Sequence, residues 1–164
     1  MSSVVSQPSY HPELIDGREI EKPLPKKFHV FVQSYLHFIL MRDLPRRYKA
    51  ASELNVLCGD DRLVPDLTVM EREAHYINSD LADPPLLVVG ILSPGQTIGQ
   101  LFDRADRLVR AGAPFCWIIW PERRKAWLYS AEDVTEARDS LVAALPGSDP
   151  GITIPLAELW AELE

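Results

Sequence analysis

The stretch "LLVVGILSPGQTIGQLFDRADRLVRAGAPFCWIIW" at residues 86–120 decides the fold. It opens with seven apolar or neutral residues, Leu86–Leu92, whose lack of polar alternation is typical of a strand covered on both faces. It closes with a similar run, Phe115–Trp120. Between them, residues 98–111 carry apolar side chains at three- and four-residue spacing, which predicts an amphipathic helix. A strand, helix and strand of these lengths predict a parallel pair joined by a right-handed crossover.

The segments before this unit predict a hairpin, a helix and a strand pair. "ELIDGREIE" has Asp16-Gly17 at its centre, which suits the positive φ angles of a tight turn. The next segment has a helical apolar pattern, ended by Pro45. Two strands then flank the turn Gly59-Asp60. The predicted ranges are 13–21 for the hairpin, 26–44 for the helix, and 48–58 and 62–70 for the strands.

The segments after the unit extend the sheet and end the domain. "KAWLYS" follows the turn "PERR" and predicts a strand that forms a hairpin with residues 115–120. A short strand at 152–154 and a helix at 156–163 follow. We therefore expect an α/β fold of the α+β type, with a mixed central sheet flanked by helices. No repeat or linker divides the chain, which predicts a single domain (11–164). The polar residues before it predict a flexible N-terminus (1–10).

Composition and charge restrict the classes of function. The 164 residues are 46% hydrophobic and 25% charged, as in an ordinary globular domain. The net charge of −7 argues against a broad nucleic-acid-binding surface, because such surfaces are usually basic. Cys58 and Cys116 lie outside any metal-binding or CxxC spacing, and no signal peptide or membrane-spanning run is present. We expect reduced thiols and a cytoplasmic protein.

Five landmarks occur in the order seen in one known family. They are "ELIDGREIE", His29 at the start of the helix, "VPDLTVM" (64–70), "LLVVGILSP" (86–94) and "AGAPFCWIIWPERRKAWLY" (111–129). From Glu13 to Glu158 the chain resembles the Uma-two family (domain of unknown function 820), restriction endonucleases of the PD-(D/E)XK superfamily. The resemblance implies a mixed sheet flanked by helices. It also implies a magnesium- or manganese-dependent endonuclease, with DNA as a candidate partner and the choice between DNA and RNA left open.

The resemblance also implies where the catalytic residues stand and which are missing. Asp66 matches the first metal-binding carboxylate. Gly90 stands where the family has the second carboxylate, a Glu, and Leu92 stands where other members of the superfamily carry Lys. In the following helix, Arg104 matches the family's Lys and Gln100 matches an Asp. Only Asp66 keeps the expected residue, so the active site is expected to be degenerate.

These substitutions favour phosphate binding over phosphate cleavage. Gly90 offers no metal ligand, while Arg104 can hold a phosphate but cannot transfer protons near neutral pH. The sequence is therefore interpreted as a nuclease scaffold that is either an impaired endonuclease or a catalytically dead homodimeric module binding nucleic acid or protein. A third interpretation is a small-molecule binder that uses the cleft around Asp66.

Another acid is a candidate for the missing ligand. If the strand pair turns at Gly59-Asp60, Glu53 lies opposite Asp66, whereas a one-residue change in the loop brings Leu54 there. Glu13 and Glu19 match acidic landmarks of the family and can approach the site. The hypothesis is that Glu53 or Glu19 provides the second metal-binding carboxylate. His29 is interpreted as a hydrogen-bonded histidine near the helix start.

The hairpin at residues 115–129 is the candidate subunit interface. Trp120 stands where the family often has Asp before Pro, which makes the hairpin entrance more apolar. A hairpin at the edge of the sheet would allow two copies to pair. On this basis we expect a homodimer.

Overall fold

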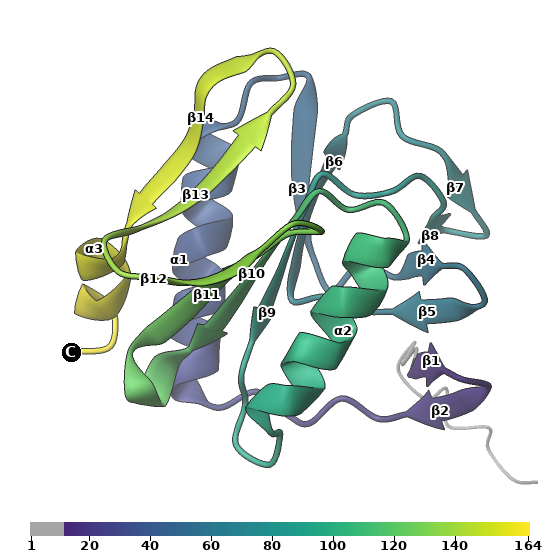
Figure 1. Cartoon of the computed structure of the whole chain (residues 1–164), viewed down its shortest axis with the longest axis horizontal. Coiled ribbons are helices and arrows are strands. Elements are labelled where there is room, and N and C mark those ends of the chain that lie inside the picture. Colours follow the sequence, from purple (N-terminus) through teal and green to yellow (C-terminus); the bar gives the residue numbers. More distant parts are fainter. Residues whose placement is uncertain (1–11) are drawn as a thin grey trace, which may run out of the picture.

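A mixed six-stranded sheet forms the centre of the molecule (Figure 1). The computed structural model describes residues 12–164, apart from the side chains of 149 and 150, so the expected flexible segment 1–10 lies outside the described residues. The strand order is β12-β11-β10-β9-β6-β3. Only β9 and β10 are parallel neighbours, as residues 86–120 predict. The strands are β3 (Tyr48–Ser52), β6 (Leu67–Glu71), β9 (Leu87–Ile91), β10 (Phe115–Trp120), β11 (Lys125–Tyr129) and β12 (Val134–Ala137).

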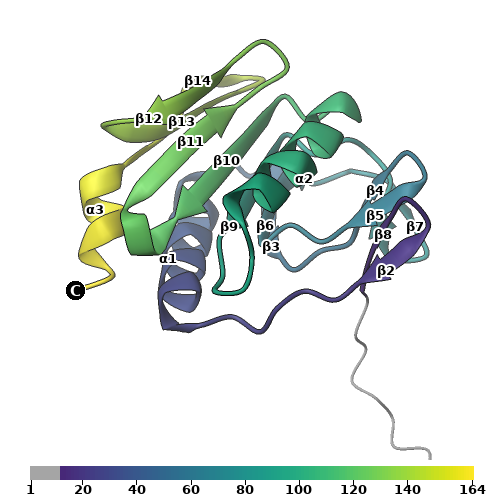
Figure 2. The ribbon, with the colours of Figure 1, turned by 60° about the horizontal axis from the view of Figure 1, so that its bottom comes forward.

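Two long helices cover opposite faces of this sheet, as the two views in Figures 1 and 2 show. Helix α1 (Lys27–Asp43) packs in one apolar cluster and α2 (Ile98–Arg110) in the other. Helix α2 begins with a capping box in which Thr97 and Gln100 bond each other's backbone N–H groups. A short 3-10 turn (Pro121–Arg123) joins β10 to β11, and α3 (Leu156–Ala161) ends the fold. Within residues 12–164, no helix is long and apolar enough to span a membrane.

A second sheet of short strands lies beside the central one (Figure 1). It contains the predicted N-terminal hairpin, in which Asp16 and Gly17 have φ angles of 52° and 76°. Its order is β2-β1-β5-β4-β8-β7. The strands are β1 (Glu13–Ile15), β2 (Arg18–Ile20), β4 (Val56–Cys58), β5 (Asp61–Leu63), β7 (Tyr76–Ile77) and β8 (Asp80–Leu81).

The two long strands predicted on either side of Gly59-Asp60 are each broken into two. The range 48–58 divides into β3 and β4 at Glu53, which has a φ of 55°. The range 62–70 divides into β5 and β6 around Pro65, which has no N–H for a central ladder. The predicted register is nevertheless confirmed: Cys58 pairs with Asp61 and Ser52 pairs with Leu67, which places Glu53 opposite Asp66.

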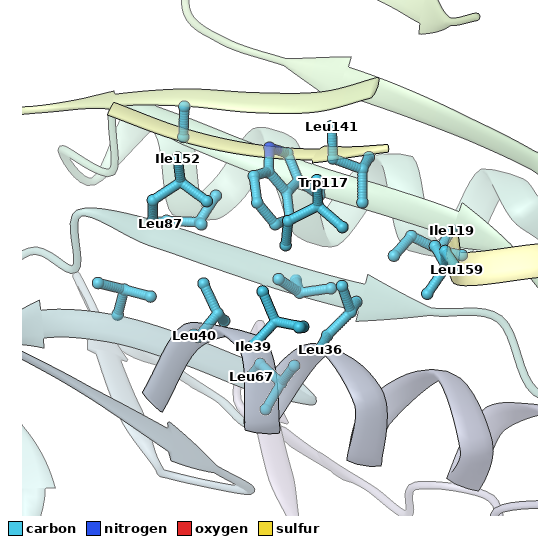
Figure 3. Packing of buried hydrophobic residues seen from close by; sticks show 14 of the residues in the cluster. Leu36, Ile39, Leu40, Leu67, Leu87, Trp117, Ile119, Leu141, Ile152 and Leu159 are labelled. Atoms are coloured by element: carbon cyan, nitrogen blue, oxygen red, sulfur yellow. The ribbon is translucent and has the colours of Figure 1, made fainter. Parts of the chain in front are cut away.

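The hairpin of β10 and β11 is not at the edge of the sheet. Strand β12 pairs along β11, so the edge expected at residues 115–129 is covered and no longer supports a homodimer. A further hairpin, β13 (Ser140–Leu145) and β14 (Ser148–Pro155), packs over the α1 face of the sheet, and the sequence did not predict β12 or β13. Figure 3 shows Trp117 beside Leu141 from this hairpin. The indole Nε1 of Trp117 donates to the carbonyl of Val142 at 2.9 Å.

Candidate active site

A cavity of about 630 Å³ opens where α1, α2 and the second sheet meet the central sheet. Its apolar floor includes Val88 and Ile118 of the central sheet and Leu108 of α2. Its polar wall consists of residues from segments far apart in the chain. These are Glu13, Lys22, His29, Gln33, Glu53, Asp66 and Arg104.

Asp66 is the buried centre of this wall. It directly precedes β6 and is 5% exposed. Its Oδ2 accepts the backbone N–H of Ile91 at 2.7 Å, while its Oδ1 lies 3.0 Å from Nε2 of His29 and 3.1 Å from Nζ of Lys22. Burial acts to raise the pKa of Asp66, but the His29 hydrogen bond and the Lys22 charge outweigh it and hold the pKa below its usual value. Asp66 is therefore an anion whose two oxygens are both engaged.

Lys22 joins Asp66 to Glu53. It lies in the segment between β2 and α1, and its Nζ donates to Oε2 of Glu53 at 2.9 Å. Gln33 of α1 completes the link, because its amide donates to Oε1 of Glu53 at 3.1 Å and to the carbonyl of Asp66 at 2.9 Å. Burial acts to lower the pKa of Lys22, but the charges of Asp66 and Glu53 outweigh it and raise the pKa.

Arg104 lines the cavity but is already paired with an acid. Its Nε donates to Oε1 of Glu13 at 2.9 Å, and its Nη1 donates to the carbonyl of Gln100 at 3.2 Å. Glu13 is 3% exposed, and its Oε2 accepts the backbone N–H of Val64 at 3.0 Å. The guanidinium of Arg104 therefore neutralises a buried carboxylate. Gln100 is used in the cap of α2 and does not belong to the cavity wall.

Position 90 of β9 is closed by an apolar side chain. A β-carbon at Gly90 would lie only 2.6 Å from Cδ2 of Leu101, which reaches it from α2. Leu101 is 6% exposed, so it fills the space into which a side chain at position 90 would project. Leu92, two residues further along the chain, is buried in the apolar cluster on the α2 side. Neither position offers a group that binds a metal or phosphate.

The comparisons with known proteins agree with this architecture. A family model described as "putative restriction endonuclease", that of Uma-two, matches residues 3–157. The chain belongs to the Uma-two family. A crystal structure described as a putative nuclease of the same family (domain of unknown function 820), from Anabaena variabilis, is similar in fold. It has a TM-score of 0.81 and 23% sequence identity, over 96% of this chain and 94% of that one. No curated protein matches the chain.

The structure brings together only some of the residues that the Uma-two resemblance singled out. Asp66, Arg104, Glu13 and Glu53 all line the cavity. Glu19 does not: it is exposed on β2, opposite Leu14 in the hairpin, so the expectation that it approaches Asp66 is not met. The reason is geometric, because Glu13 is on the buried face of the hairpin and Glu19 is on the solvent side.

Sequence reasoning missed two residues of the cavity wall. Lys22 stands in "EKPLP", a segment with no helical or strand periodicity, so nothing in the pattern indicated where its side chain lies. Gln33 is on α1 one turn after His29. Since residues four apart share a helix face, His29 could have indicated that Gln33 also faces the site.

The residues at position 66 and position 90 do not together form a site for a divalent cation. Within residues 12–164, no three His, Cys, Asp or Glu side chains converge as a metal-binding group. Of the two positions that the resemblance assigns to metal-binding carboxylates, only Asp66 carries one, and both of its oxygens are engaged by donors of this chain. A magnesium ion commonly takes one or two carboxylates and requires near-octahedral oxygen geometry. The described residues therefore do not form a magnesium site at Asp66 and position 90.

Proposed function

We propose that this chain binds nucleic acid in the cavity of a nuclease fold and does not carry out metal-dependent phosphodiester hydrolysis. One observation carries the loss of hydrolysis: the family's second acid is replaced by Gly90, and Leu101 fills the space beside it. Hydrolysis of this type requires an ion that activates water and neutralises charge on the phosphate. Without a ligand at position 90, that ion would lack one of the family's two metal-binding carboxylates.

Arg104 does not restore the missing chemistry. A guanidinium stays protonated near neutral pH, so it cannot accept a proton from the attacking water. Its charge is also matched by the buried carboxylate of Glu13 at 2.9 Å. Because its Nε and Nη1 already donate within this chain, Arg104 does not activate a nucleophile, and phosphate binding depends on other cations near the cavity.

Nucleic-acid binding is supported by the family's fold and by a local basic patch at the cavity mouth. Pro25 lines the cavity, and the next two residues, Lys26 and Lys27, are exposed at the start of α1. The net charge of −7 opposes binding elsewhere on the surface. Binding confined to such a patch should be weak and sensitive to salt, since it rests on a few phosphate groups.

Two assays on the purified chain test the two parts of this proposal. Plasmid nicking is measured with Mg²⁺ or Mn²⁺ for the natural chain and for Asp66→Ala. We expect equal, background levels of nicking. Nicking by the natural chain that Asp66→Ala abolishes would overturn the loss of hydrolysis.

Binding is measured by fluorescence anisotropy of a labelled oligonucleotide across a salt series. Lys26→Glu with Lys27→Glu should weaken binding and reduce the salt slope by about one for each phosphate that the variant no longer neutralises. Lys125→Glu changes an exposed residue of β11 that does not line the cavity, so it is the matched control and should have a much smaller effect. No binding at low salt, or equal weakening by both variants, would contradict a site at the cavity mouth.

A further inference from the structure

Three oxygens of residues 53–66 lie within hydrogen-bond distance of the ammonium group of Lys22. Its Nζ lies 2.9 Å from Oε2 of Glu53, 2.8 Å from the carbonyl oxygen of Val64 and 3.1 Å from Oδ1 of Asp66. The first oxygen follows β3, and the other two come from the break between β5 and β6. Two carboxylates and one carbonyl therefore converge on one cation from two separate segments.

These oxygens are of the types that bind hard divalent cations. Carboxylate and backbone carbonyl oxygens are common ligands of Mg²⁺ and Ca²⁺. The distances of 2.8–3.1 Å are those of hydrogen bonds to an ammonium, longer than the roughly 2.0–2.1 Å of a magnesium–oxygen bond. The set also differs from the family's pair of acids, because it uses Glu53 and Val64 and needs nothing from position 90.

The negative charges around the ammonium group of Lys22 would also be balanced by a divalent cation. Asp66 and Glu53 carry one negative charge each, and Lys22 neutralises one of them. Across the cavity, Glu13 and Arg104 neutralise each other. Without the ammonium, two carboxylates would face one another near the partly buried site, where repulsion and desolvation are both unfavourable. A divalent cation would balance both charges.

We propose that Lys22 is a built-in replacement for a divalent cation, and that removing its ammonium group opens a metal site formed by Glu53, Val64 and Asp66. In the natural chain, an incoming ion must displace an ammonium that is attached to the protein and hydrogen-bonded to all three oxygens. The natural chain therefore folds and keeps this site intact without metal. This inference concerns cation occupancy alone and does not rest on nucleic-acid binding.

Lys22→Met in the full chain tests the inference, because methionine keeps an unbranched side chain and removes the charge. Thermal unfolding is measured with EDTA and with MnCl₂, and bound Mn²⁺ is counted from the loss of the free-ion EPR signal. We expect Lys22→Met to unfold at a lower temperature with EDTA and to bind one Mn²⁺. At a hundredfold excess of Mn²⁺ over its Kd, its Tm should rise by about 5–10 °C.

Two further variants locate the effect. Lys49→Met removes an exposed lysine of β3 that does not line the cavity, and it should show no bound Mn²⁺ and no change of Tm on adding the ion. Lys22→Met combined with Asp66→Asn should lose the bound Mn²⁺ and the rise in Tm, because it lacks one of the two carboxylates.

Three outcomes would overturn the inference. The first is stoichiometric Mn²⁺ binding to the natural chain that disappears in Asp66→Asn. The second is a folded Lys22→Met that binds no Mn²⁺, and the third is a Lys22→Met that stays unfolded with Mn²⁺ present. A Lys22→Met that folds only with Mn²⁺ supports it. None of these measurements uses nucleic acid, so they are independent of the test of the proposed function.

Discussion

Cδ2 of Leu101 lies 2.6 Å from the point that a β-carbon at Gly90 would occupy. The φ angle of Gly90 is outside the left-handed region, so its backbone does not itself require glycine. The requirement is space, because α2 packs against β9 at this point through a leucine. Glycine at position 90 and the packing of Leu101 therefore depend on each other, because any side chain at position 90 would require Leu101 to move.

We predict that Gly90→Ala destabilises the fold by about 1–3 kcal/mol, because the added methyl group forces Leu101 to move within a packed core. Leu101→Ala alone should cost about 2–5 kcal/mol through the cavity it leaves. The double variant should be more stable than the sum of the two effects predicts, since the methyl group then enters that space. Urea unfolding of the four proteins measures this coupling.

Gly99→Ala is the matched control for the glycine substitution. Gly99 lies in α2, and a β-carbon there would meet only Oγ1 of Thr97 at 3.9 Å. Alanine has the higher helix propensity, so this variant should be up to about 1 kcal/mol more stable. Additive effects of Gly90→Ala and Leu101→Ala would contradict direct contact between positions 90 and 101.

The sequence predicted the parts of the site that depend on periodicity and register. Residues 86–120 have clear strand and helix periods, so the parallel pair and α2 follow from them. The turn at Gly59-Asp60 fixed the pairing of the two strands, and this placed Glu53 opposite Asp66. These predictions held because local backbone geometry determines them.

The parts that failed depend on long-range packing. The breaks at Glu53 and Pro65 separate two sheets, and they depend on how these segments meet the N-terminal hairpin. The aperiodic segment containing Lys22 is positioned by the acids that it contacts, 31 and 44 residues further along the chain. Edge strand β12 is mostly exposed, so it has no apolar pattern to indicate it.

The free energy of unfolding should fall in acid because of Asp66. Its pKa in the folded protein is below the ordinary value of 3.8, so the unfolded chain binds a proton more readily. The stabilisation is complete above that value and is lost as the pH falls below it, through the lowered pKa. Urea unfolding from about pH 6 to about pH 3 measures the loss.

Asp66→Asn identifies the part of this acid dependence that comes from the site. The asparagine variant should be less stable at neutral pH, because Lys22 then loses one of its two acid partners in the described part of the chain. Its stability should also change less below pH 4, since the titrating group is gone. Asp43→Asn removes an exposed acid paired with Arg42 and should leave most of the acid dependence in place. Identical pH profiles for Asp66→Asn and the natural chain would rule out Asp66 as its source.

Both thiols should be unreactive in the folded protein. Burial, together with the charge of Asp61, raises the pKa of Cys58 to about 11, and burial raises the pKa of Cys116 as well. Since the thiolate is the reactive form, a disulfide reagent at pH 8 should label neither residue in native buffer and both in urea. Rapid labelling of Cys116 in native buffer would show that the cavity opens more widely than the structure indicates, since this residue lines its floor.

Arg107 connects α2 to the second sheet. The spacing of Asp103–Arg107 and Asp106–Arg110 predicts two equivalent surface pairs, and both ion pairs form. Only Arg107 also contacts Asp16 in the N-terminal hairpin and Asp61 at the start of β5, each at 3.0 Å. Its guanidinium therefore bridges three carboxylates from three elements.

Arg107→Ala should consequently destabilise the fold more than Arg110→Ala does, because it removes the guanidinium that bridges three acids. Arg110→Ala should change the free energy of unfolding by no more than about 0.5 kcal/mol, as for an exposed helix pair. Urea unfolding at low and high salt distinguishes them, since salt should reduce the Arg107 effect by screening the carboxylates. Equal effects of the two substitutions would mean that Asp16 and Asp61 add nothing to the pair within α2, and that apolar packing alone holds the second sheet against the helix.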